Sequence, residues 1–145
     1  MLDTGPLVAF LDRLEEHHAW AKREFGQLHP PLLTCEAVLA EACWLVRGIP
    51  GGATAIMELV ERGIVKVPFR LETDVEGVRK AMDRYSNLPM SLADACLVRM
   101  AEIHAAVEVL TLDSHFQIYR LSNRRIVPVR MPGEKRMAQD ARRTE

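Results

Sequence analysis

Residues 91–98, with the sequence Ser-Leu-Ala-Asp-Ala-Cys-Leu-Val, are the stretch around which the rest of the chain is organised. In an α-helix, residues three, four, seven and eleven positions apart share one face. At these distances after Asp94 the chain has only apolar residues, Leu97, Val98, Ala101 and Ala105. Asp94 is therefore predicted on the apolar side of its own helix. A carboxylate facing a core costs free energy unless a cation or hydrogen-bond donors meet it, so the position indicates a partner such as a metal ion.

The same residues also fit a helix cap. In a capping box, Ser91 would be the N-cap and the Asp94 carboxylate would accept a hydrogen bond from the N-cap amide. Caps are common and catalytic acids are rare, so Asp94 taken alone favours the cap. The other acidic residues of the chain are what favour a metal site.

The length and composition are typical of one globular domain. The chain has 145 residues, of which 48% are hydrophobic and 27% charged, and no apolar run approaches the roughly 20 residues of a membrane span. No signal peptide is expected at Met1. The three cysteines, Cys35, Cys43 and Cys96, form no Cys-x-x-Cys pair, which predicts free thiols in a reducing, cytoplasmic compartment. The histidine spacing does not indicate a zinc site.

Charge is divided unevenly along the chain. Residues 1–123 hold 12 Lys and Arg against 17 Asp and Glu, a balance of −5, whereas residues 124–145 hold 7 against 3, a balance of +4. We expect a single domain over residues 1–130, followed by a polar, basic and frayed tail over residues 131–145. The basic end either contacts a polyanion or is an ordinary solvated tail.

Strands and helices alternate along the sequence. Short strands are predicted at residues 1–3, 32–34, 64–67, 107–112 and 126–129, and helices at residues 7–11, 15–28, 36–47, 53–61, 73–85, 91–105 and 116–121. The helix at 36–47 is predicted to bury Val38, Leu39, Ala42, Leu45 and Val46, and the helix at 73–85 to bury Val75, Val78 and Met82. This alternation predicts an α/β fold with a parallel sheet and right-handed crossovers.

Four acids are predicted to meet at one edge of this sheet. Ligands of parallel sheets bind outside the carboxyl ends of the strands. Asp3 and Asp113 each end a predicted strand, and Asp94 lies in the first turn of the helix that precedes the strand of Asp113. Glu41 lies within two turns of the start of the helix after the strand at 32–34, on the flank of its apolar face.

Four ionised carboxylates cannot share a small site unless cations neutralise them. Oxygen ligands without His or Cys indicate a hard ion, Mg²⁺ or Mn²⁺, which stabilises charge in a phosphoryl displacement. The predicted chemistry is phosphodiester hydrolysis. Neighbouring hydroxyls could orient the acids or a water, or serve only as turn and cap residues: Thr4, Ser91, Thr111 and Ser114.

The chain resembles the PIN-domain ribonucleases in four acidic motifs and in their order. These motifs are Asp3-Thr4-x-x-Leu7, Val38-Leu39-Ala40-Glu41, Ser91-Leu92-Ala93-Asp94-Ala95 and Val109-Leu110-Thr111-Leu112-Asp113-Ser114-x-Phe116. The similarity covers about residues 1–130. In size the chain is most similar to the VapC-type toxins of bacterial and archaeal toxin–antitoxin pairs.

The resemblance implies a PIN-like three-layer α/β/α sandwich whose short, mostly parallel central sheet is flanked by helices. It also implies an Mg²⁺- or Mn²⁺-dependent endoribonuclease that acts on RNA, forms a homodimer and is blocked by an antitoxin. Two positions differ from the family pattern. Only Met1 and Leu2 precede Asp3, so either the first strand is minimal or the true start lies upstream, and His115 stands where an acid is frequent.

Three other functions compete with this one. Asp3-Thr4-Gly5 is also the motif of aspartic proteases, but their carboxylate pair needs a β-rich frame. A phosphoacceptor receiver domain would need a lysine after a late strand, and none follows Val127-Pro128 at the strand end. A catalytically silent PIN-like module that binds RNA or a protein partner is the non-enzymatic alternative, and the presence of all four acids argues against it.

Overall fold

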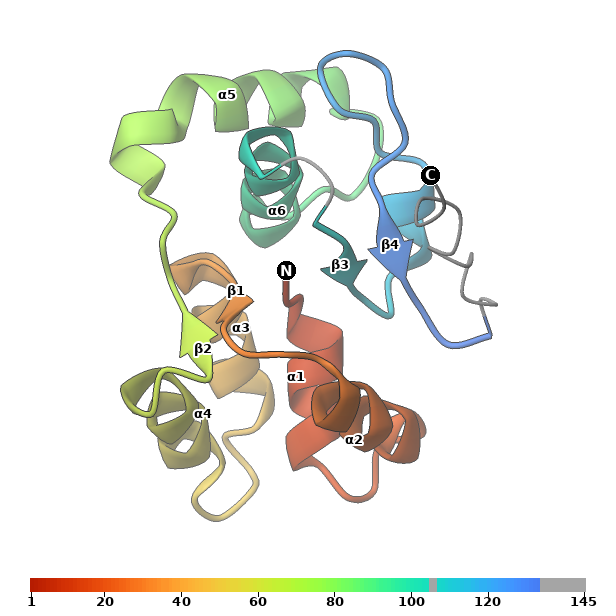
Figure 1. Cartoon of the computed structure of the whole chain (residues 1–145). Helices are drawn as coiled ribbons and strands as arrows, with labels where there is room; N and C mark the ends of the chain where they lie inside the picture. The colour runs from red at the N-terminus through yellow and green to blue at the C-terminus, as the bar shows by residue number, and fades with distance from the viewer. Residues whose placement is uncertain (105–106, 134–145) are drawn as a thin grey trace, which may run out of the picture.

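The computed structural model describes residues 1–104 and 107–133, in which helices and short strands alternate (Figure 1). The α-helices are α1 (Thr4–Leu11), α2 (His18–Gln27), α3 (Glu36–Leu45), α4 (Gly52–Glu61), α5 (Leu71–Arg84) and α6 (Leu92–Ile103). The strands are β1 (Leu32–Leu33), β2 (Val65–Lys66), β3 (Val109–Leu110) and β4 (Val129–Arg130), and a 3-10 helix, η1 (Ser114–Gln117), follows β3.

The strands form two parallel pairs that the N-terminal residues join. Leu32 and Leu33 of β1 pair with β2, and Val109 and Leu110 of β3 pair with β4. Leu2 forms a parallel bridge to Leu110, and its backbone N–H donates to the carbonyl of Leu33 over 2.8 Å. Figure 1 shows the N-terminus between the two pairs. The first three residues thus lie at the centre of the sheet, with Asp3 at its carboxyl edge, and the strand predicted at residues 1–3 is reduced to the single bridge of Leu2.

The core divides between the two faces of this sheet. Neighbouring residues of a strand point to opposite faces. Met1 and Val109 pack with side chains of α5 and α6, whereas Leu2 and Leu110 pack with side chains of α1 and α4. Figure 1 shows α5 and α6 on one side of the strands and α1, α2 and α4 on the other. The result is three layers with a short parallel sheet in the middle, which confirms the predicted fold class.

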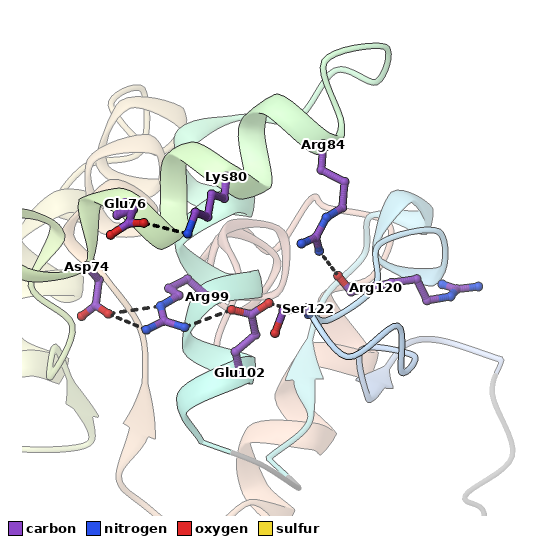
Figure 2. A network of polar contacts seen from close by, with 8 residues as sticks. All are labelled: Asp74, Glu76, Lys80, Arg84, Arg99, Glu102, Arg120 and Ser122. Atoms are coloured by element: carbon purple, nitrogen blue, oxygen red, sulfur yellow. Dashed lines mark hydrogen bonds and ion pairs between the residues drawn. The ribbon is translucent and has the colours of Figure 1, made fainter.

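Arg99 on α6 links this helix to α5, which covers the same side of the sheet. Arg99 donates to Asp74 of α5 over 3.1 Å and to Glu102 of its own helix over 3.1 Å, as Figure 2 shows. A Cβ atom at Gly77 would lie 2.7 Å from Cδ and Nε of Arg99, so only glycine lets the arginine stem lie against α5. This contact helps to fix α6, the helix that carries Asp94.

The segment after η1 is held against the ends of both helices. Arg84 at the end of α5 donates to the carbonyl of Arg120 over 3.3 Å (Figure 2). Tyr85 accepts from the backbone N–H of Arg120 over 2.6 Å, and Glu102 accepts from that of Ser122 over 2.7 Å. The backbone of residues 120–122 is therefore bonded to side chains from α5, α6 and the residue after α5.

Several elements differ in extent from the prediction. The strand predicted at 107–112 is confined to Val109–Leu110, because the Thr111 side chain accepts from the backbone N–H of Asp113 and the chain turns there. The strand predicted at 126–129 is also displaced: β4 begins at Val129, and Ile126 instead forms an antiparallel bridge to Arg120. A 3-10 helix over Ser114–Gln117 replaces the helix predicted at 116–121.

Two predicted apolar stripes are partly wrong. On α3, Leu45 is 56% exposed although Val38, Ala42 and Val46 are buried as expected. On α5, Val75 is 55% and Met82 39% exposed, while Val78 is buried. These three residues share a helix face with buried ones, but no neighbouring element of the described chain covers them.

Other predictions concern the cysteines, the tail and the membrane. Cys35, Cys43 and Cys96 are free thiols, as expected. Most of the tail predicted at 131–145 lies outside the described residues, and the boundary at residue 130 stays a prediction. Within residues 1–104 and 107–133, no helix combines the length and apolar character that crossing a membrane requires.

Candidate active site

An open pocket of about 400 Å³ lies at the carboxyl edge of the sheet. Its lining includes all four predicted acids: Asp3, Thr4, Gly5, Glu41, Pro89, Ser91, Asp94, Leu112 and Asp113. These residues come from the end of the central strand, from α1, α3 and α6, and from the turn after β3. The topology therefore brings the four acids together as expected, and their role as metal ligands stays a prediction.

Asp3 is the most deeply placed of the four. It is 6% exposed, and as the N-cap of α1 it accepts from the Thr4 backbone N–H over 2.7 Å. Its second oxygen accepts from the Thr111 hydroxyl over 2.6 Å. Burial raises the pKa of Asp3 to about 6 despite these two hydrogen bonds, and the charges of Asp94 and Asp113 act in the same direction as burial. Keeping Asp3 ionised thus costs free energy that a nearby cation would offset.

Asp94 confirms the capping interpretation and faces the pocket as well. Its Oδ2 accepts from the Ser91 backbone N–H over 3.0 Å, while its own N–H donates to the Ser91 hydroxyl over 3.1 Å, which completes the capping box. Asp94 is 8% exposed. Burial raises its pKa, and the charges of Asp113 and Glu41 add to this effect. The Asp94 side chain therefore both caps α6 and lines the pocket.

Glu41 and Asp113 complete the ring of acids. Glu41 is half-buried on α3 and accepts from the Thr4 hydroxyl over 2.9 Å. Asp113 caps η1 by accepting from the His115 backbone N–H over 2.9 Å, and the same oxygen lies 2.7 Å from Nδ1 of the His115 ring. Thr111 joins the two sides of the pocket, because it donates to Asp3 and accepts from the backbone of Asp113.

Three of the four carboxylates have one oxygen that accepts no hydrogen bond from the described chain. The hydrogen bonds within residues 1–104 and 107–133 use Oε2 of Glu41, Oδ2 of Asp94 and Oδ1 of Asp113. No fully buried side-chain oxygen of the described residues lacks a hydrogen-bond partner, so the other oxygen of each is accessible to solvent.

The donor set fits a hard divalent cation. No Lys or Arg of the described residues forms an ion pair with any of the four acids, so their charge is not neutralised by the chain there. No three of the described His, Cys, Asp and Glu side chains lie close enough to hold one ion directly. Mg²⁺ usually keeps several waters and is bound through one or two carboxylates, a mode that an open ring of acids allows.

The predicted hydroxyl residues fall into two groups. The hydroxyls of Thr4 and Thr111 donate directly to carboxylates. Ser91 donates its backbone N–H to the Asp94 carboxylate, and its hydroxyl accepts from the Asp94 backbone N–H. Ser114 is exposed, and its side chain forms no hydrogen bond with the four acids within the described chain. For Ser114 the alternative of a turn residue is therefore the better one.

Two residues beside the acids were missed as parts of the site. Tyr119 is fully buried and donates to Oδ2 of Asp94 over 3.3 Å. Burial and the charge of Asp94 raise the pKa of Tyr119, so its hydroxyl stays protonated. His115 contacts Asp113. His115 is noted from the sequence as standing where an acid is frequent, two residues after Asp113, whereas nothing in the sequence points from Tyr119 to Asp94.

A comparison with family models places the chain. Residues 1–121 match the PIN domain, which covers the four acids and all elements as far as η1. The chain belongs to the PIN-domain family. PIN domains are nucleases and typically depend on a metal ion. A search among curated proteins found no match.

Proposed function

We propose that this chain is a metal-dependent endoribonuclease that hydrolyses phosphodiester bonds of RNA at the pocket of Asp3, Glu41, Asp94 and Asp113. The observation that carries the proposal is the ring of four carboxylates around one open pocket, with no Lys or Arg of the described chain paired to them. Like charges so placed are stable together only if a cation joins them or if some are protonated. Burial is the main cause that raises the pKa of Asp3 and of Asp94, and the charges of the neighbouring acids add to the rise.

The four acids would hold Mg²⁺ or Mn²⁺. When bound, such an ion neutralises the carboxylates and stabilises the negative charge that develops on a phosphate during displacement of an ester oxygen. Hydroxyl side chains of the protein hold the acids in position. Thr4 and Thr111 fix Asp3 and Glu41, and Ser91 fixes Asp94, so the acids keep their places without a bound ligand. The open pocket leaves room for a polymeric substrate to pass across the edge of the sheet.

The finer parts of the proposal rest on the resemblance of the four motifs. We assign the chain to the VapC-type toxins, with a cognate antitoxin that blocks the site and with a homodimer as the active form. The free thiols suit a reducing compartment such as the cytoplasm. The basic residues of 124–145 would assist RNA binding by contacting phosphates.

One observation favours a second candidate function. Because no three acid, histidine or cysteine side chains of residues 1–104 and 107–133 converge on one point, a silent PIN-like module that binds RNA or a partner remains the alternative. Such a module would bind RNA without cutting it, with or without metal.

Cleavage assays separate the two functions. The purified chain is incubated with a mixed panel of RNAs in Mg²⁺, in Mn²⁺ or in EDTA, beside the variants Asp94→Asn and Asp83→Asn. Asp83 is an exposed acid of α5 that pairs with Arg79, so it controls for the loss of one charge. We expect cleavage that needs metal, that Asp94→Asn abolishes and that Asp83→Asn retains. Equal cleavage by Asp94→Asn, with an unchanged far-UV circular dichroism spectrum, would contradict the proposal.

A further inference from the structure

Tyr119 binds one of the four acids without lining the pocket itself. Its side chain is fully buried, with its ring 5.3 Å from that of Phe116 and 5.1 Å from that of Tyr85, measured between centroids. Its hydroxyl donates to Oδ2 of Asp94 over 3.3 Å. A buried tyrosine hydroxyl needs a partner, and here that partner is one of the four acids.

The position of this tyrosine is fixed by its neighbours in the chain. Figure 2 shows Arg84 bonded to the carbonyl of Arg120 and Glu102 bonded to the backbone of Ser122. The Tyr85 hydroxyl accepts from the backbone N–H of Arg120 over 2.6 Å. These bonds hold the backbone on the C-terminal side of Tyr119, and the two aromatic contacts hold its ring. These contacts therefore hold the Tyr119 hydroxyl in one position, from which it donates to Asp94.

Both donors to the Asp94 carboxylate reach the same oxygen. The Ser91 backbone N–H binds Oδ2 over 3.0 Å from the start of α6, and the Tyr119 hydroxyl binds it from a different element. Oδ1 accepts no hydrogen bond from residues 1–104 or 107–133. A single donor lets a carboxylate turn about its bond to Cβ, whereas two donors from different directions restrict that rotation.

We propose that Tyr119 is a positioning residue that turns Oδ1 of Asp94 toward the pocket and so sets the affinity of the site for its divalent ion. The inference rests on the proposed function and adds to it a residue that never touches the ion or the RNA. Groups that orient metal ligands in this way commonly contribute about 10-fold to 100-fold in metal affinity or activity.

The test is Tyr119→Phe with Phe69→Leu as the packing control. Each substitution trims one buried ring of the same core cluster, but only the hydroxyl of Tyr119 binds an acid. Binding of Mn²⁺ alone is measured by isothermal titration calorimetry on the metal-free proteins, and thermal unfolding in EDTA reports the fold. We expect about tenfold weaker Mn²⁺ binding in Tyr119→Phe and a change within about twofold in Phe69→Leu.

The outcomes distinguish failure of this inference from failure of the proposed function. A wild-type chain that binds no Mn²⁺ would overturn both. A wild-type chain that binds Mn²⁺ no more tightly than a folded Tyr119→Phe variant would overturn the inference alone. An equal loss in Tyr119→Phe and Phe69→Leu would assign the effect to packing and also overturn it.

A double variant gives a second test. If Tyr119 acts through Asp94, removing its hydroxyl in an Asp94→Asn background changes the remaining Mn²⁺ affinity little, because the carboxylate that it orients is gone. Losses that add fully in Asp94→Asn/Tyr119→Phe would show that the two residues act independently and would contradict the proposal.

Discussion

The Thr111 hydroxyl donates to Oδ2 of Asp3 over 2.6 Å, although 108 positions separate the two residues in the chain. The bond crosses from the turn after β3 to the end of the central strand, and both residues are buried. The same threonine oxygen accepts from the backbone N–H of Asp113. The Thr111 side chain therefore connects two of the four acids at the sheet edge where the pocket lies.

Replacing this threonine by valine should destabilise the fold. Thr111→Val keeps the shape but removes the donor to Asp3 and the acceptor for Asp113, and leaving buried polar groups unpaired costs about 1–3 kcal/mol. Urea unfolding at neutral pH measures the loss. Thr73→Val, at an exposed position of α5, is the control and should change the free energy of unfolding little. Equal stability of Thr111→Val and wild type would show that the bond contributes nothing.

The stability of the metal-free chain should fall as the pH rises from about 4 to above 6. The pKa of Asp3 is about 6 in the folded state against 3.8 for an ordinary aspartate, so the unfolded chain ionises more readily. The folded state holds the proton of Asp3 more tightly than the unfolded state does. The stabilisation that this gives is complete below pH 3.8 and is lost as the pH rises through 6. At about 1.4 kcal/mol for each pKa unit, the loss is about 3 kcal/mol.

The variant Asp3→Asn isolates this effect. It should flatten the pH dependence of the free energy of unfolding in EDTA and be more stable than wild type near pH 7, because the amide carries no charge. Asp83→Asn, at an exposed site, should keep the wild-type profile. If Asp3→Asn shows the same slope between pH 4 and 7 as the wild type, the buried charge of Asp3 is not its source.

Adding a methyl group at Gly77 should disturb the Arg99 contact between α5 and α6. In Gly77→Ala the new Cβ would lie 2.7 Å from Cδ and Nε of Arg99, whose guanidinium is held by Asp74 and Glu102. Forcing an anchored side chain to move costs typically about 1–3 kcal/mol.

The matched control for Gly77→Ala is a second helical glycine. Gly26 of α2 has open space where a Cβ would be placed, so Gly26→Ala should be neutral or stabilising by up to about 1 kcal/mol. Thermal unfolding compares the two variants. A more stable Gly77→Ala would mean that Arg99 shifts without cost.

Two exposed arginines after the 3-10 helix should contribute to RNA affinity. Arg124 and Arg125 are both exposed and open the basic stretch of 124–145. If they contact phosphates, Arg124→Gln/Arg125→Gln should weaken binding of uncleaved RNA and lower the salt dependence by about 1 to 2 in slope.

The control for the arginine variant carries the same change of charge elsewhere. Arg79→Gln/Lys80→Gln alters two exposed residues of α5 that pair with acids of the same helix. Binding is measured by fluorescence anisotropy at several salt concentrations in EDTA. The same loss of affinity in both double variants would indicate an effect of overall charge and not of a phosphate contact.

Much of the fold follows from local patterns and chain order. The apolar runs before Asp3 and Asp113 mark segments that pair in the sheet, and parallel strands place their carboxyl ends at one edge. The capping box of Ser91 and Asp94 follows from four consecutive residues and needs no tertiary contact. For these reasons the alternation of elements, the layered α/β class and the meeting of the four acids could be predicted.

The exact extent of the elements could not be predicted in the same way. Val109–Leu110 is short because Thr111 bonds across the turn, and Ile126 leaves the sheet because it pairs with Arg120. These are specific hydrogen bonds of the turns, and periodicity carries no information about them. The exposure of Leu45, Val75 and Met82 was not predicted either, since a helix pattern tells which residues share a face but not which of them a neighbouring element covers.

The sequence by itself determined that this chain carries four acids at the edge of a parallel sheet, because residue order and periodicity fix the succession of elements and which residues share a helix face. Only the tertiary structure decided which oxygens of Glu41, Asp94 and Asp113 accept no hydrogen bond from the described residues, and which side chains bind the acids, as Tyr119 binds Asp94 and Thr111 binds Asp3. The physical reason is that hydrogen bonds are set by angles and distances of a few tenths of an ångström. Such distances arise only when layers far apart in the chain are packed together.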